Sequence, residues 1–236
     1  GVEALLRWHH PEWGEIEPTE FIPIAERTGQ VVSLGDWVLE QALKEWKVWA
    51  EKIDRPPRVG VNVSARQLQD DNHFDEIVAS MLRKHDVTGG VLEIEITETM
   101  LVDHIQKRAA TLSNIKALGV NIALDDFGTG YSSLSYLSRF VVDTIKVDQS
   151  FIRGLSVDAK DTAIVHAVSI LSRAMGIELV AEGVETEAQL NALRRMHYQV
   201  VQGYLFAPPM PGNAFLEFML RLQKEGAPAA FTSARS

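Results

Sequence analysis

Acidic and amide side chains stand at the ends of several apolar runs in this sequence. The run NIAL, residues 121–124, is followed directly by Asp125 and Asp126 and then by a turn that contains Gly128 and Gly130. Successive side chains of a strand point to opposite faces, so both aspartates can share one site only if the chain turns there. The glycines supply the backbone freedom for that turn. Two neighbouring carboxylates of this kind can bridge two cations about 3.5–4 Å apart.

The same placement recurs along the chain, because most of the other apolar runs also carry a polar residue at or near their carboxyl end. These strand-end residues are Glu3, Asn62, Glu95, Asp125, Lys146, Glu182 and Gln202. In a closed barrel of parallel strands all carboxyl ends meet at one mouth, so the seven residues would converge; in an open sheet the outer strands would lie too far apart. A solvent-facing strand end explains any one of them but not all seven together. We therefore predict a barrel.

The charges of this mouth favour bound metal ions. Its acidic residues are Glu3, Glu95, Asp125, Asp126, Glu182 and Glu185, and its cations are Arg7 and Lys146. The balance of −4 is the charge that two divalent ions cancel. Oxygen ligands without histidine or cysteine select Mg²⁺ or Mn²⁺ over Zn²⁺. Two such ions beside a lysine indicate hydrolysis of a phosphodiester or a phosphomonoester, and the residues alone leave the ester open.

The elements that must position these residues alternate between strands and helices. The predicted strands cover residues 2–7, 59–63, 91–96, 120–124, 144–148, 177–182 and 199–206. Apolar residues three or four apart predict helices between them, and Thr186 with Gln189 forms a capping box that starts one. Strand followed by helix, seven times over, predicts an α/β fold with parallel strands, which we interpret as a TIM-type (β/α)₈ barrel with one strand missing.

Composition limits the partners and the compartment. None of the apolar runs approaches the length of about 18 residues that a membrane span needs, and the N-terminus GVEALLRW lacks signal-peptide features. We therefore expect no membrane contact by this domain and a cytoplasmic location. The net charge of −9, without a basic stripe, argues against a nucleic acid polymer as partner.

The ends of the chain suggest a domain taken from a longer protein. The first residue is not methionine, and the chain opens inside a predicted strand. Strand spacing without a low-complexity linker predicts one domain over residues 1–224, and the composition of residues 225–236 predicts a disordered tail. The parent protein could be anchored in a membrane.

Seven ordered motifs over most of the chain resemble one family, the EAL domains, which are phosphodiesterases of cyclic di-GMP in bacterial signalling. The motifs are EALLRW (3–8), NVSARQL (62–68), EITE (95–98), DDFGTGYSSL (125–134), IKVD (145–148), AEGVET (181–186) and QGYLFAPPMP (202–211). The resemblance implies a modified TIM barrel whose first strand is antiparallel and normally precedes the EAL motif. That strand is absent here or lies upstream of residue 1.

The resemblance also implies a reaction and roles for single residues. Linear 5′-pGpG would be the product, formed by attack of a metal-activated water. One ion would be held by Glu3, Asn62, Glu95 and Asp125, and a second would be held or ordered by Asp125, Asp126 and Glu185. Glu182 would act as general base or orient the water, with contact to a metal as its alternative. Lys146 would polarise the water and the scissile phosphate.

The same resemblance implies further residues that bind the substrate or organise a loop. Arg7 would grip a phosphate as a fork and Gln202 would line the substrate or water site, whereas Asp148 would either contact substrate or hold Lys146. Glu98 would anchor the loop 126–133, which the family links to dimerisation, so we expect a homodimer. For Gly128 and Gly130, turn formation and a phosphate cradle remain equal alternatives.

The resemblance further implies two divalent cations, Mg²⁺ or Mn²⁺, with Ca²⁺ as an inhibitor, and fusion to upstream sensory or GGDEF domains. The competing function is a catalytically silent receptor that binds cyclic di-GMP and passes the signal to a partner. Such receptors typically lose metal ligands or degrade the DDFG loop, and both are complete here. The sequence therefore favours the active hydrolase.

Several other residues invite a functional reading that simpler roles explain. Arg7 could pair with Glu3 or Glu93, and Glu93, which faces inward below Glu95, is expected to form a structural ion pair. The tryptophans 37, 46 and 49 lie at helical spacing, which favours packing. The adjacent histidines 9 and 10 lie in an exposed connection and are not expected to bind metal.

Overall fold

The structure is a computed structural model that describes residues 1–101, 105–129, 141–155 and 157–226. These residues form two compact units. The first comprises Gly1–Ile96 and Met100–Ile122, and the second comprises Thr97–Thr99 and most of the chain from Ala123 onward. Each unit contains its own run of parallel strands and its own covering helices.

The sheet of the first unit has three parallel strands in the order β1 (Val2–Ala4), β4 (Val59–Asn62) and β5 (Leu92–Thr97). Alternation along β5 explains its place, because Leu92, Ile94 and Ile96 are fully buried and point to one face. The glutamates 93 and 95 alternate with them and therefore point to the other face. The sequence thus directs two carboxylates of one strand to the same side.

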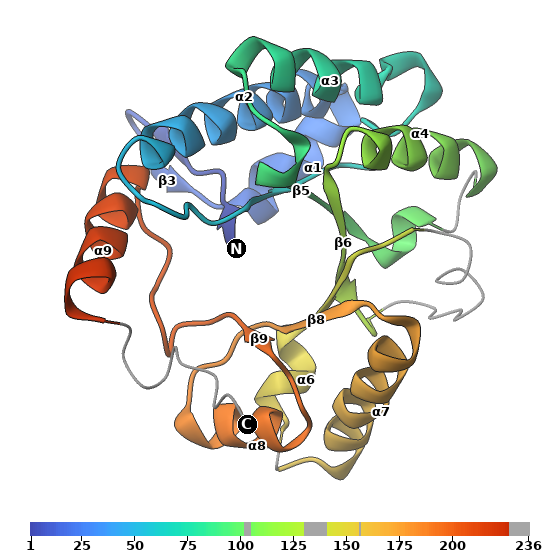
Figure 1. Ribbon diagram of the computed structural model, residues 1–236. Helices are drawn as coiled ribbons and strands as arrows, with labels where there is room; N and C mark the ends of the chain where they lie inside the picture. Colours follow the sequence, from blue (N-terminus) through green and yellow to red (C-terminus); the bar gives the residue numbers. More distant parts are fainter. Residues whose placement is uncertain (102–104, 130–140, 156, 227–236) are drawn as a thin grey trace. The chain divides into compact units, whose positions relative to one another are not determined.

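Four helices accompany these strands: α1 (Pro18–Thr28), α2 (Val31–Ala50), α3 (Phe74–His85) and α4 (Ile105–Ala117). α2 packs on β4 and on α3, and α3 packs on α4. Figure 1 shows α2, α3 and α4 along the top of the view. In α2, Leu39 and Leu43 are almost fully buried. Trp49 is buried beside them, and the Trp46 Nε1 donates to the carbonyl of Pro57 at 3.0 Å, so both have packing roles. Trp37 is 52% exposed.

A small antiparallel hairpin, β2 (Trp8–His10) and β3 (Gly14–Ile16), follows β1. The sequence analysis was wrong here, since it extended the first strand to residue 7 and treated residues 9–15 as a connection. Trp8 packs edge-on against Phe21 at a ring-centroid distance of 5.5 Å, and this contact with α1 stabilises strands too short to be predicted. His9 pairs with Glu15 at 3.2 Å, which agrees with a structural role for that histidine.

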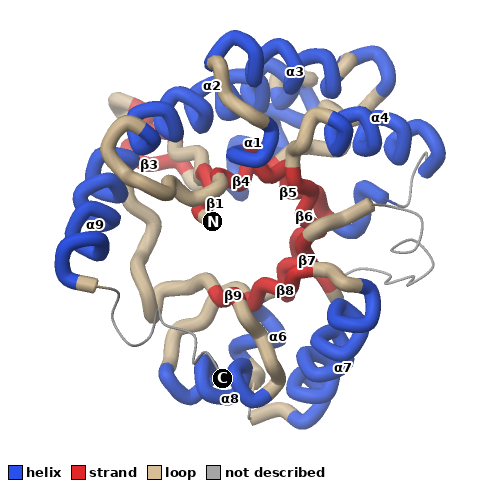
Figure 2. The backbone as a smooth tube through the Cα atoms, viewed as in Figure 1, coloured by secondary structure: helices blue, strands red, loops and turns tan. Residues whose placement is uncertain are grey.

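The second unit continues with four parallel strands, β6 (Asn121–Phe127), β7 (Thr144–Val147), β8 (Glu178–Ala181) and β9 (Val200–Val201). Figure 2 shows β7, β8 and β9 as consecutive short strands. β9 is much shorter than the predicted strand 199–206. Gly203 lies against the backbone of Val184, where a Cβ would come within 2.3 Å, and the chain then turns before Pro208. This close approach ends the strand.

The helices of the second unit are α6 (Gln149–Arg153), α7 (Ala159–Met175), α8 (Glu187–Arg195) and α9 (Gly212–Glu225). α7 packs against α6 and β8. The hydroxyl of the buried Tyr198 donates to the carbonyl of Val165 at 2.9 Å and ties the segment after α8 to α7. Because α9 extends to Glu225, an ordered helix reaches the first residue of the predicted tail, and residues 227–236 lie outside the described part. The domain limits 1–224 and 225–236 stay predictions.

Membrane-spanning character is absent from the described helices. None of those within the described ranges combines the length and the apolar composition that a membrane crossing requires.

The predicted capping box at the start of α8 is confirmed. The Thr186 hydroxyl accepts from the Gln189 backbone at 3.2 Å, and the Gln189 side chain accepts from the Thr186 backbone at 2.9 Å. Thr186→Ala should cost about 1 kcal/mol, because one helix donor loses its partner. For a domain of this size the expected fall in Tm is about 2–4 °C, measured by circular dichroism. Gln189→Ala removes the other half of the box, and unchanged Tm values for both variants would contradict the assignment.

Candidate active site

The first unit brings three oxygen-bearing side chains together at the carboxyl ends of adjacent strands. Glu3 is on β1, Asn62 on β4 and Glu95 on β5, and Asn62 is paired directly with Glu95 in the register of the sheet. The Asn62 Nδ2 donates to Glu3 Oε1 at 2.5 Å. Glu3 and Glu95 each offer a carboxylate oxygen within 4.8 Å of the other. Three of the four predicted ligands of one ion therefore converge within this unit.

Gly60 makes room for the Glu95 carboxylate. A Cβ on Gly60 would lie 2.0 Å from Glu95 Oε1, so any side chain on this residue of β4 would occupy the same space. Glu95 is only 3% exposed, and a carboxylate so deeply buried requires a positive or hydrogen-bonding environment. The sequence analysis missed Gly60, although a glycine inside the strand VGVN is a signal of close approach.

Glu93, which lies one pleat before Glu95, has the structural role that was predicted for it. Its Oε2 lies 3.5 Å from the Nε of Arg58 in an ion pair. Arg7 is exposed, and its Nη1 donates to the Leu6 carbonyl at 2.8 Å. The cation that pairs with Glu93 in this unit is therefore Arg58, and the predicted substrate-binding role of Arg7 remains a prediction.

A lysine between two carboxylates forms the centre of the site in the second unit. Lys146 on β7 is 3% exposed, and its Nζ lies 3.3 Å from Asp125 Oδ1 and 2.8 Å from Glu182 Oε1. Asp125, Asp126 and Glu182 each contribute one oxygen to a group whose members lie within 4.8 Å of one another. These four residues come from the ends of three neighbouring strands. The three carboxylates offer only oxygen ligands, which fits a hard cation such as Mg²⁺ or Mn²⁺.

The turn predicted at the two aspartates is present. Asp126, which is not a glycine, adopts a left-handed backbone conformation there. The pairing of β6 with β7 shifts between Leu124 and Phe127, which marks a bulge. Asp126 itself adopts a left-handed backbone with φ of 53°, and its N–H donates to Asp125 Oδ1 at 3.0 Å. Asparagine and aspartate tolerate this region better than most residues. The bulge places both carboxylates on one side of the sheet.

Burial raises the pKa of Asp126 above its ordinary value, and the neighbouring charges of Asp125 and Asp148 raise it further. The ammonium of Lys146 opposes this shift in the pKa, but it does not cancel it. A proton therefore binds more readily than usual at a carboxylate that faces other carboxylates. A divalent cation would remove the same electrostatic conflict, which supports the fit of the oxygen group to a metal.

Two residues near this group have contacts that organise the backbone. The Gly128 N–H donates to Glu98 Oε2 at 3.4 Å, and the role of Glu98 in anchoring the loop 126–133 stays a prediction. Asp148 is the N-cap of α6, where its Oδ1 accepts from the Ser150 backbone at 3.0 Å and from the Ser150 hydroxyl at 2.5 Å. This capping role is additional to the two that the sequence suggested. Gly130 lies outside the described residues.

Two further predicted residues of the second unit, Glu185 and Gln202, are exposed. Glu185 is exposed just before α8, and its N–H donates to Gln189 Oε1 at 2.9 Å; within the described chain its carboxylate is not part of the group around Lys146. Gln202 is exposed directly after β9, and its N–H donates to the Ala181 carbonyl at 2.8 Å. Their roles toward metal and substrate stay predictions.

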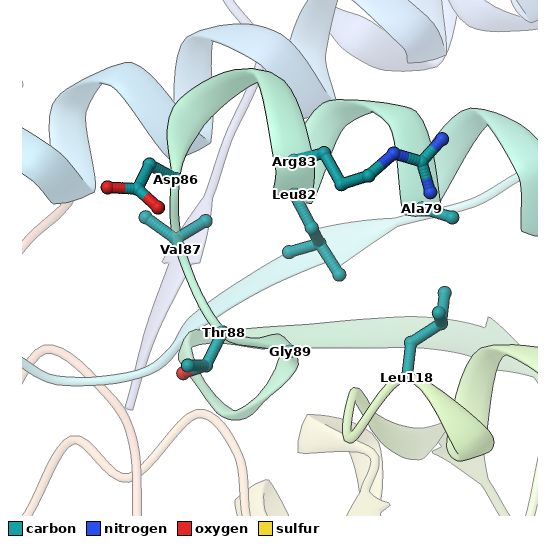
Figure 3. Close-up of a pocket in the computed structure, with 8 residues that line it drawn as sticks. All are labelled: Ala79, Leu82, Arg83, Asp86, Val87, Thr88, Gly89 and Leu118. Atoms are coloured by element: carbon teal, nitrogen blue, oxygen red, sulfur yellow. The ribbon is translucent and has the colours of Figure 1, made fainter.

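A separate cavity of about 450 Å³ lies in the first unit between the carboxyl end of α3, residues 87–89 and Leu118 (Figure 3). Leu82 points from α3 into this opening, and Leu118 faces it from the other side. Gly89 precedes the start of β5, whereas Glu95 lies near the end of that strand. This cavity therefore opens at the opposite end of the strand from the predicted ligands.

Parallel strands that alternate with helices, with carboxylates and a lysine at their carboxyl ends, define a β/α domain whose acidic groups could hold a metal ion. The EAL domain family model matches residues 1–209. This chain belongs to the EAL family, and the resemblance seen in its motifs is confirmed.

Two curated relatives come from Pseudomonas aeruginosa. The bifunctional diguanylate cyclase/cyclic di-GMP phosphodiesterase MucR is 41% identical over 216 residues, which is 92% of this chain and 31% of MucR. The cyclic di-GMP phosphodiesterase NbdA is 39% identical over 227 residues, which is 96% of this chain and 29% of NbdA. The chain therefore spans about a third of the length of these relatives.

A solved structure of the PaMucR phosphodiesterase in complex with c-di-GMP has the same fold. Its sequence is 40% identical to this chain. The match covers 90% of this chain and 86% of the solved chain, and the two superpose with a TM-score of 0.86. The predicted fold class is thereby confirmed as a mostly parallel α/β domain of the TIM type. Seven parallel strands are described here, one fewer than in a complete (β/α)₈ barrel.

Proposed function

We propose that this domain is a metal-dependent phosphodiesterase that hydrolyses cyclic di-GMP to linear 5′-pGpG. The observation that carries the proposal is Lys146, buried between Asp125 and Glu182 in a group of three carboxylates. Such an arrangement provides oxygen ligands and a fixed positive charge at one place. Membership in the EAL family and the activities for which MucR and NbdA are named support cyclic di-GMP as the substrate.

The proposed ligand set holds two ions. Glu3, Asn62, Glu95 and Asp125 would hold one ion, and Asp125, Asp126 and Glu185 would hold or order the other. The contact of Asn62 with Glu3, the burial of Glu95 and the raised pKa of Asp126 support this assignment. When bound, two divalent cations supply positive charge to the phosphodiester and lower the pKa of an attacking water.

The other residues of the proposed site would activate the water, stabilise charge and bind the substrate. Glu182 would orient the attacking water and accept its proton, as the water oxygen forms a bond to phosphorus and the bond to the leaving 3′ oxygen breaks. The ammonium of Lys146 would stabilise the charge that develops on the phosphoryl oxygens. Arg7 would grip a phosphate as a planar fork, and Gln202 would line the substrate or water site. Asp148 would either contact the substrate or hold Lys146.

Partners and regulation extend beyond this chain. The relatives are about three times longer, and MucR combines two activities in one protein, which supports a parent with further domains such as an upstream sensory or GGDEF domain. We propose a homodimer in the cytoplasm, formed by a domain that does not itself contact the membrane. Mg²⁺ or Mn²⁺ would support turnover, and Ca²⁺ would inhibit it.

The test is an incubation of the purified domain with cyclic di-GMP and Mn²⁺, followed by separation of the nucleotides. We expect 5′-pGpG to accumulate, to stop on addition of EDTA and to resume with excess Mn²⁺. Retention of intact cyclic di-GMP on the protein, with no product at any metal concentration, would instead identify a receptor. The matched reaction with Ca²⁺ distinguishes a requirement for catalysis from a general effect of divalent charge.

A further inference from the structure

We infer that the short helix α6 positions both active-site loops of the second unit, with Phe151 and Gln149 as its positioning residues. The loop after β6 carries Asp126, and the loop after β8 carries Glu182. Each loop has a glycine that lies against a different side chain of α6. The inference rests on the proposed function, because it concerns the distance between two side chains proposed to serve one reaction.

The first contact joins the loop after β6 to Phe151. Gly128 has a φ of 100°, a left-handed conformation that favours glycine, and a Cβ on it would lie 2.8 Å from Phe151 Cε2. The ring of Phe151 therefore fills the space directly against the backbone of Gly128, two residues after Asp126. On another side the Gly128 N–H is bound by Glu98. The loop is held between a carboxylate and an aromatic ring.

The second contact joins the loop after β8 to Gln149. Gly183 also has a left-handed backbone, with φ of 66°, and a Cβ on it would lie 2.5 Å from the Cβ of Gln149. Gly183 directly follows Glu182. A further bond lies beyond it, where the Gln189 Nε2 donates to the Ile152 carbonyl of α6 at 3.1 Å. The loop after β8 and the first turn of α8 therefore both contact α6.

The third connection is the covalent one to β7. Lys146 on β7 lies two residues before Asp148, and Asp148 caps α6 through Ser150. Since β7 lies between β6 and β8 in the sheet, the helix that follows it stands between the two loops. A displacement of α6 would move the supports of Asp126 and Glu182 together, relative to Lys146.

Phe151→Ala tests this inference through metal binding as well as turnover. Removing an outer partner of a metal site typically weakens metal affinity or activity about 10–100-fold. We expect Mn²⁺ to bind the variant about 10-fold more weakly, measured by titration calorimetry on the metal-free protein. The kcat should fall while the KM changes little, and Phe151→Leu, which restores part of the side chain, should recover most of the loss.

Two further variants keep the test independent of folding. Gln149 is exposed, so Gln149→Gly, which also removes the Cβ that lies against Gly183, should fold normally and still weaken Mn²⁺ binding. Phe218→Ala, which truncates a half-buried phenylalanine on α9, controls for the loss of an aromatic side chain and should bind Mn²⁺ as the unmodified domain does.

The outcomes separate the inference from the proposed function. Unchanged Mn²⁺ affinity and unchanged kcat in both α6 variants, beside an active unmodified domain, would overturn the inference and leave the function intact. An unmodified domain that binds Mn²⁺ without turnover would overturn the function, and the binding titrations would still decide the role of α6. Absence of Mn²⁺ binding in the unmodified domain would overturn both.

Discussion

Asp125→Ala is expected to abolish turnover of cyclic di-GMP. Asp125 is the residue that the proposed ligand set assigns to both ions, and its Oδ1 lies 3.3 Å from the Nζ of Lys146. Loss of an outer partner already costs about 10–100-fold, so loss of the shared ligand should exceed about 100-fold. Steady-state formation of pGpG at low micromolar Mn²⁺ measures the effect. Glu3→Ala should also abolish turnover, because it removes another proposed ligand of the first ion.

Folding must be separated from metal loss in these variants. Lys146 keeps its contact with Glu182 when Asp125 is truncated, so no isolated buried ammonium is created and the domain should still fold. Circular dichroism checks this point. Glu217→Ala, which removes one exposed carboxylate from α9, is the matched control for net charge. Full activity of Asp125→Ala at low metal would refute its role as a ligand.

Lys146→Ala is expected to lower kcat far more than it raises KM. The ammonium is almost fully buried and fixed between two carboxylates, so it can stabilise charge in the transition state without reorganisation. Removal of one such preorganised group typically costs about 10²–10³-fold in kcat. Initial rates across a range of cyclic di-GMP concentrations, at saturating Mn²⁺, separate the two constants.

The matched variant for this experiment is Lys146→Arg, which keeps the charge but changes the shape of the group. Because a guanidinium cannot adopt the same position between Asp125 and Glu182, we expect it to recover only part of the activity. A turnover number of Lys146→Ala equal to that of the unmodified domain would show that the lysine has no catalytic role.

Much of the site followed from the sequence because the position of a residue along a parallel strand determines where it lies. Asn62 and Glu95 end neighbouring strands of the same direction, and the register pairs them directly. Likewise, a buried lysine on β7 necessarily faces the carboxylates at the ends of β6 and β8. Side chains alternate along a strand, so the sequence of β5 also predicted that Glu93 and Glu95 point away from the face that buries its leucine and isoleucines.

Features that depend on tertiary contacts could not be read in this way. The hairpin of β2 and β3 requires the packing of Trp8 on Phe21, and β9 ends because Gly203 meets the backbone of Val184. Both contacts join residues more than ten positions apart, whereas strand propensity is local. The left-handed conformation of Asp126 and the capping role of Asp148 were also missed, since each depends on the neighbouring loop or helix.

The most direct test of the account is a structure of the domain crystallised with Mn²⁺, in which anomalous scattering locates the ions. We predict one Mn²⁺ whose ligands include Glu3, Asn62, Glu95 and Asp125, with oxygen distances below about 2.5 Å. A second Mn²⁺ should contact Asp126. Ions that contact only one of these side chains, or none, would contradict the proposed ligand set.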